Sequence, residues 1–150
     1  MQFDVQRLLR LWTDPLPEDD GAAAAAFREI YRDPVTVNGV PLSVTDLVAR
    51  ARAMQEALER PEGEVLGVVD AGGSVAVAFR LAGRQVGPLQ TPAGPVPPSG
   101  RRVDVQIIDV LTLGDGRISE IRTVADWLGA LAAVGAVRVS AHVPEPRADS

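Results

Sequence analysis

The chain has 150 residues, of which 46% are hydrophobic and 23% charged, and its formal net charge is −5. This composition is typical of one globular domain with a single core. The absence of cysteine excludes disulfides, thiolate nucleophiles and cysteine-ligated zinc, and the only histidine is His142. No basic cluster offers a nucleic-acid surface, and no run of residues is long and apolar enough for a membrane span. We therefore expect a cytoplasmic protein without a metal site, a nucleic-acid partner or a membrane partner, whose chemistry uses carboxylates, amides, arginines or Tyr31.

The first half of the chain predicts three helices. Apolar residues recur at helical spacing over 3–12 until the segment 13–17 stops the pattern, and the alanine-rich segment 22–31 predicts a second helix. Residues 35–40 read as a short strand and turn, and Ser43 to Asp46 opens a third helix that Pro61 ends.

The second half predicts strands. Segments 65–70 and 74–81 flank a Gly72-Gly73 turn, and segments 103–113 and 118–125 flank Asp115-Gly116, a dipeptide suited to a tight hairpin. Residues 87–100 are rich in proline and glycine and predict a loop, either a pocket cover or an inert surface segment. A short helix over 127–134 follows, and 140–150 reads as a disordered tail after a domain of residues 1–139. The order of elements predicts an α+β fold in which helices pack on one face of a curved antiparallel sheet around an apolar pocket.

The last hairpin brings together the main candidate residues. A two-residue turn pairs Leu113 with Ile118 and places Asp109 opposite Arg122, with Cβ atoms about 5 Å apart. Such a pair is either a structural ion pair or part of a site. The same face would carry the apolar pocket residues Val105, Ile107 and Val124.

Asp126 has two interpretations. At the end of this face, four residues beyond Arg122, it would lie among apolar side chains, where burial raises a carboxyl pKa and suits it to proton transfer near neutral pH. It also directly precedes the helix over 127–134 and could be the N-cap of that helix, which would lower the pKa instead.

Two further polar residues are candidates for substrate contacts. Tyr31 could present its phenol to the pocket or be a core tyrosine, and Asn38 could bind substrate or form a turn with Gly39. Trp12 and Trp127 are more typical of core anchors than of substrate platforms.

The order of several segments, 31–39, 98–103, 114–120 and 126–131 with Gly135, resembles the SnoaL-like polyketide cyclase or ester cyclase family. The resemblance implies a nuclear-transport-factor-2-like cone, usually a homodimer, that acts without a cofactor on a small polyketide-like substrate in bacterial antibiotic biosynthesis. It also implies that Asp126, at the start of the final helix, is the acid and base of an intramolecular aldol ring closure.

The sequence departs from the family at two places. Gln85 stands where the family often has a histidine, which makes it a candidate substrate-binding residue, and Ile121-Arg122 stand where it often has His-Trp. One alternative is therefore a ketosteroid isomerase-like enzyme or an epoxide-opening enzyme that uses Asp109, Arg122 and Asp126. Another is a non-enzymatic dimer module that binds a small molecule.

The opposite face of the last hairpin predicts a dimer contact. There Ile108, Val110 and Ile121 interrupt a polar set, a mixture too apolar for full exposure and polar enough for an interface. The polar set is Gln106, Thr112, Ser119 and Thr123.

Overall fold

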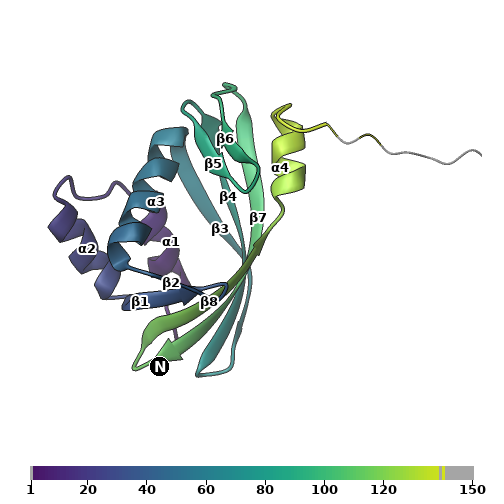
Figure 1. Cartoon of the computed structure of the whole chain (residues 1–150). Helices are drawn as coiled ribbons and strands as arrows, with labels where there is room; N and C mark the ends of the chain where they lie inside the picture. The colour runs from purple at the N-terminus through teal and green to yellow at the C-terminus, as the bar shows by residue number, and fades with distance from the viewer. Residues whose placement is uncertain (1, 139, 141–150) are drawn as a thin grey trace, which may run out of the picture.

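A curved, open sheet of six strands forms the body of the protein, and three helices cover its concave face (Figure 1). The computed structural model describes residues 2–138 and 140. The strand order is β2-β1-β8-β7-β4-β3, and a separate two-stranded hairpin lies above the sheet. The sheet strands are β1 (Tyr31–Val37), β2 (Val40–Leu42), β3 (Leu58–Asp70), β4 (Ser74–Gln85), β7 (Arg102–Gly114) and β8 (Arg117–Ala125). This α+β cone confirms the predicted fold class, with one correction: β1 runs parallel to β8, so the sheet is mixed.

A capping side chain precedes the first residue of each helix. Helices α1 (Val5–Thr13) and α2 (Asp20–Arg28) are capped by the side chains of Asp4 and Asp19, which accept hydrogen bonds from backbone N–H groups of the first turn. Helix α3 (Val44–Ala57) carries a complete capping box between Ser43 and Asp46. Helix α4 (Trp127–Ala133) follows β8 directly. In the described part of the chain no helix has the length and apolarity needed to span a membrane.

Several predicted boundaries were wrong. Tyr31 opens strand β1 instead of ending the second helix, and Pro61 lies inside β3 instead of stopping the third. The predicted loop over 87–100 contains the hairpin of β5 (Leu89–Thr91) and β6 (Gly94–Val96). Apart from Ser140, the predicted tail lies outside the described residues, as does His142.

A bulge in the last hairpin overturns the predicted register. The turn pairs Leu113 with Ile118 as predicted, but the next pair is Thr112 with Glu120, so Ser119 is an extra residue in β8. Because side chains alternate along a strand, one extra residue exchanges the faces of everything beyond it. Asp109 therefore lies opposite Thr123, not Arg122.

The core has two parts on the concave side. The larger surrounds Phe27 and joins α1, α2 and α3 to the sheet, and the smaller joins Leu58, Val105 and Leu131 beneath the β5–β6 hairpin and α4. Between them the concave side of the sheet is left partly open.

Candidate functional site

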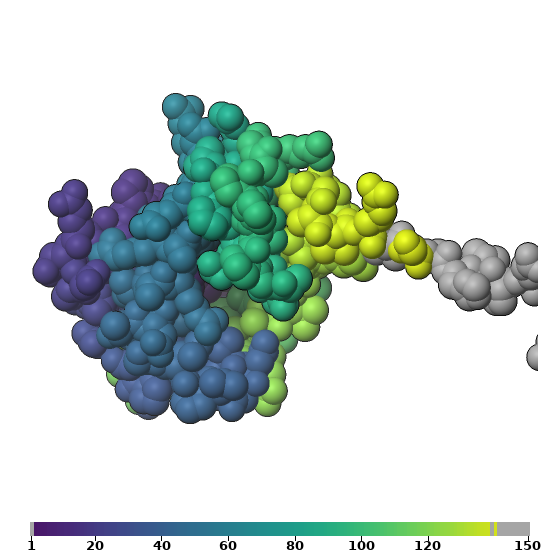
Figure 2. Space-filling model, turned by 45° about the horizontal axis from the view of Figure 1, so that its top comes forward, coloured from purple at the N-terminus to yellow at the C-terminus, as the bar shows by residue number. Residues whose placement is uncertain are grey.

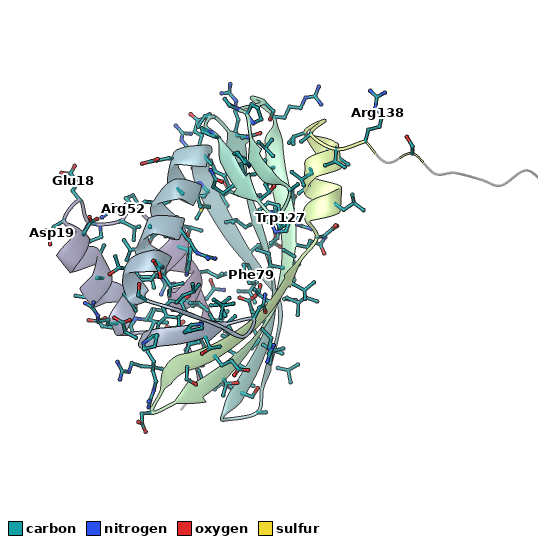
Figure 3. The ribbon with its side chains drawn as sticks, in the orientation of Figure 1. Glu18, Asp19, Arg52, Phe79, Trp127 and Arg138 are labelled. Carbon is teal, nitrogen blue, oxygen red and sulfur yellow. The ribbon has the colours of Figure 1, made fainter. Side chains whose placement is uncertain are left out.

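An apolar cavity of about 600 Å³ occupies the concave side of the sheet. Side chains of α1, α3, β4, β7, β8 and the β5–β6 hairpin line it, and Figure 2 shows a hollow between α3 and that hairpin. Phe79 and Trp127 line it on the concave side of the sheet (Figure 3). Both the volume and the apolar lining are typical of small-molecule sites.

Among the described residues that line the cavity, only Asp109 and Arg50 belong to charged types. Asp109 lies within β7, whereas Arg50 belongs to α3 and is exposed to solvent. The cavity therefore contains a carboxyl group in its wall and a guanidinium group at its solvent-exposed side.

The Asp109 carboxyl group is poorly solvated. Its Oδ1 atom is buried and has no hydrogen-bond partner. Burial raises the pKa of Asp109, and the adjacent Thr123 hydroxyl acts in the opposite direction. A carboxyl whose pKa is raised by burial, facing an apolar cavity, is suited to exchange protons with a bound ligand.

Tyr31 adds a phenol to the same cavity. Its hydroxyl accepts a hydrogen bond from Trp12 Nε1 at 2.8 Å, and its ring stacks on Phe27 with ring centroids 5.9 Å apart. Burial raises the pKa of Tyr31, and the charge of Asp109 raises it further. The phenol therefore stays protonated at neutral pH, and because Trp12 occupies it only as an acceptor, its own O–H can be donated to a ligand.

Asn38 holds the strand that carries Thr123. Its Nδ2 donates to Thr123 O at 3.2 Å, and its Oδ1 accepts from Thr123 N at 2.9 Å. Asn38 has φ +48° in the turn after β1, so the turn interpretation describes its backbone. It is not among the cavity-lining residues; it positions Thr123 beside Asp109 instead.

Gln85 is completely buried and fixes the segment that carries the β5–β6 hairpin. Its Nε2 donates to three backbone carbonyls, those of Gly87, Val96 and Pro97, at 3.0–3.3 Å. Its Oε1 accepts from the Ser99 hydroxyl at 2.7 Å. Both side-chain polar atoms are thus used within the protein. Gln85 lies outside the cavity lining and holds the hairpin that forms one wall of the cavity.

Two of the predicted residues lie on the outer, convex face because of the bulge at Ser119. Arg122 is exposed and lies 3.5 Å from a Glu120 carboxylate oxygen, and Val124 is 76% exposed. The predicted ion pair of Asp109 with Arg122 was therefore wrong. Val105 and Ile107 keep the predicted face and line the cavity.

Asp126 occupies the N-cap position of α4. Its Oδ1 accepts a hydrogen bond from Gly129 N at 3.0 Å, and the residue is exposed. It directly follows the last residue of β8 and is not among the cavity-lining residues. The N-cap interpretation describes its contacts, and Asp126 does not join Asp109 in the cavity lining.

Sequence reasoning missed three features of the site. The predicted register places Thr123 on the other face of the sheet, and the sequence predicts core anchors at Trp12 and Trp127, whereas all three residues line the cavity. Trp127, at the start of α4, could have indicated the cavity, because α4 directly follows β8, a strand that contributes to the cavity wall. In the described part of the chain no three acidic or histidine side chains converge as a metal site would require.

Comparisons with known proteins agree with this architecture. The profile of the family described as SnoaL-like polyketide cyclase matches residues 6–134. No curated protein matches the sequence. Among solved structures, TsrD from Streptomyces laurentii has a TM-score of 0.73 and 21% identity, over 89% of this chain and 92% of that one.

Two other solved structures are similar over most of the chain. A protein from Jannaschia sp. CCS1, named as a candidate SnoaL-like polyketide cyclase, has a TM-score of 0.67 and 29% identity over 89% of this chain and 92% of its own. IdmH from Streptomyces antibioticus, named as a candidate polyketide cyclase, has a TM-score of 0.67 and 19% identity over 87% and 95%.

Proposed function

Because the chain belongs to the SnoaL-like polyketide cyclase family, we propose that it closes a ring in a polyketide-type carbonyl compound, with Asp109 as the acid and base. Membership of this family supports a cyclase-type function on a small molecule. The observation that supports the assignment to Asp109 is its buried, unpaired carboxyl oxygen in the wall of a large apolar cavity.

The reaction can proceed with the groups of this cavity alone. The Asp109 carboxylate removes a proton from the carbon between two carbonyl groups, and the electron pair of the broken C–H bond forms an enolate. The enolate carbon attacks a second carbonyl carbon of the same molecule and forms the ring C–C bond. The resulting alkoxide then takes the proton back from Asp109, which restores the carboxylate, so that no external oxidant, reductant or base is consumed.

Tyr31 is proposed as the group that stabilises the enolate oxygen. Its raised pKa keeps it a hydrogen-bond donor, and the bond from Trp12 polarises its O–H toward the ligand. A donor placed in advance in a site of low polarity stabilises the charge that develops on oxygen in the transition state. Apolar walls such as Val105 and Ile107 would fold the flexible chain so that its reacting carbons meet.

An epoxide-opening reaction that uses Asp109 and Asp126 together lacks support from the geometry. Two carboxyl groups that activate one water must reach a common position, whereas Asp109 lines the cavity and Asp126 is an exposed helix cap outside the cavity lining. Asp126 nevertheless supplies the control for the proposed role of Asp109, since it is an aspartate outside the cavity lining.

Deuterium exchange at the acidic carbon of an aryl 1,3-diketone tests the proposal, since exchange reports the first proton transfer without requiring the natural substrate. We expect the wild-type protein to accelerate exchange, Asp109→Asn to abolish the acceleration and Asp126→Asn to keep it. Loss with Asp126→Asn and retention with Asp109→Asn would reverse the assignment. Binding of the diketone without any exchange would favour a non-enzymatic binding module.

A homodimer is proposed through the convex face of the sheet. The register pairs exposed Ile108 of β7 with exposed Val124 of β8, and exposed Val110 of β7 with half-buried Ala76 of β4. Ile121, by contrast, is buried in the core, so its predicted place in the interface was wrong.

Sedimentation over a range of concentrations tests the dimer. Ile108→Arg should shift the protein toward a monomer without unfolding it, because the residue is 58% exposed. A wild-type monomer at high micromolar concentration would contradict the proposal.

A further inference from the structure

We infer that the substrate carries an anionic group, most simply a carboxylate, which Arg50 binds at the mouth of the cavity while the apolar remainder of the molecule reaches Asp109. The inference deepens the proposed function by naming a substrate feature, and it rests on that function only for the identification of the cavity as the active site.

The placement of Arg50 within α3 is the first support. It lies on the same side of the helix as Leu47, Ala53 and Met54, which all line the cavity. Residues three or four apart share one side of a helix, so Arg50 belongs to the row of residues that forms this wall. Its exposure to solvent shows that it lies where the wall reaches the surface.

The absence of a competing partner is the second support. Among the described residues, no carboxylate lies within salt-bridge distance of Arg50, and its side chain donates no hydrogen bond to them. Arg52 in the same helix differs: it lies 2.9 Å from an Asp20 carboxylate oxygen and donates to Pro17 O at 2.6 Å. Figure 3 shows Arg52 directed toward the segment of Glu18 and Asp19, away from the cavity.

The charge pattern of the cavity is the third support. With one cationic group at the exposed side and one acidic group in the apolar wall, the cavity favours one orientation of a ligand with a single anionic end. The anionic end would be repelled by ionised Asp109 and attracted by Arg50, whose planar guanidinium matches the two oxygens of a carboxylate. The carbon that loses its proton would then lie near Asp109.

A pair of fluorescent probes tests this inference without any catalysis. Anthracene-2-carboxylic acid and anthracene-2-carboxamide share their aromatic body and differ in charge, and both accept energy from tryptophan. Trp12 and Trp127 both line the cavity and are the only tryptophans of the chain, so quenching of their emission reports occupancy. An exposed charge pair contributes little binding free energy, and a charge-assisted bidentate contact contributes more. The wild-type protein should therefore bind the acid about threefold to tenfold more tightly than the amide.

Three variants decide the outcome. Arg50→Gln should bring the affinity of the acid down to that of the amide and leave the amide unchanged, whereas Arg50→Lys should retain part of the preference. Arg10→Gln, an equal change of charge at an exposed position outside the cavity, should leave both affinities unchanged. Equal affinities for the two probes in the wild type, or a preference that survives Arg50→Gln, would overturn the inference.

The orientation has its own test. Asp109→Asn should change the affinity for the acid little if the carboxylate lies at Arg50, and a large gain would instead place the carboxylate beside Asp109 and overturn the inference. Because these probes do not react, failure here leaves the proton-transfer role of Asp109 intact, and failure of the exchange assay leaves the role of Arg50 intact.

Discussion

Replacing Asp109 should stabilise the fold while it removes activity. The buried Oδ1 of Asp109 lacks a hydrogen-bond partner, and a buried polar atom without a partner costs about 1–3 kcal/mol of folding free energy. Asp109→Leu removes that cost and adds an apolar side chain to an apolar wall, so we expect a gain of about 1–3 kcal/mol. For a domain of this size, such a gain raises Tm by about 2–12 °C.

The pH dependence of the unfolding free energy separates the effect of the Asp109 charge from the effect of its side-chain shape. Its pKa in the folded protein is raised above the ordinary value, so the folded state holds the proton to a higher pH than the unfolded chain does. Below the unfolded pKa both states are protonated and the carboxyl carries no ionisation penalty. As the pH rises from the unfolded pKa to the folded pKa, the unfolded state loses its proton first and stability falls. Above the folded pKa the penalty is constant.

Urea unfolding of the wild type and of Asp109→Asn at a series of pH values measures this effect. The stability advantage of the variant should be small in acid, grow as the pH passes the ordinary carboxyl range, and then level off. Asp104→Asn provides the control, because Asp104 lies on the opposite face of β7 and is 3.1 Å from Arg80 Nε. If Asp109→Asn were less stable than the wild type at neutral pH, the argument that burial of this carboxyl destabilises the fold would be refuted.

Three further substitutions test Tyr31 in the cavity and two residues that hold the β5–β6 hairpin. Tyr31→Phe should lower kcat for ring closure or exchange roughly a hundredfold, since it removes one oxyanion donor, and an unchanged kcat would exclude Tyr31 from that role. Gln85→Ala should lower the unfolding free energy measured in urea by about 2–4 kcal/mol, because it leaves the carbonyls under the β5–β6 hairpin unpaired. The same substitution should raise KM. It should not shift the pH at which the rate is half-maximal, because Asp109 determines that pH. Gly87→Ala should weaken anthracene-2-carboxamide binding, as its Cβ would lie 2.7 Å from Glu56 O; full affinity would show that the hairpin adjusts freely.

The helices and the fold family could be predicted because their signals are local. Apolar spacing and the capping residues Ser43 and Asp46 identify helices from a few neighbouring residues, and the structure places helices there. The Asp115-Gly116 turn was likewise predicted from its dipeptide, and both residues have positive φ. Boundaries were harder to predict, since the alanine-rich segment lacks a strong stop and Tyr31 joins the sheet through its pairing with Ile118.

The site was harder to predict because it depends on pairing across the chain. The two-residue turn determines only the first pairs of the hairpin, and nothing in the segment 117–125 announces that Ser119 is an extra residue. Sequence reasoning identified Asp109 but gave it the wrong neighbour, and it selected Arg122 and Val124 from the wrong face. Gln85 and Asn38 were recognised as polar residues of interest, although their hydrogen bonds to distant backbone groups could not be foreseen.

The bulge at Ser119 and the contacts of Asn38 together explain why burial dominates the pKa of Asp109. Without the bulge, Arg122 would lie opposite Asp109, and an arginine so close would hold the carboxyl ionised and lower its pKa. With it, the neighbour is Thr123, an uncharged residue whose backbone N–H and C=O both hydrogen-bond to the Asn38 side chain. One inserted residue therefore replaces an ion pair with a neutral contact, and burial is left as the dominant influence on the pKa of Asp109.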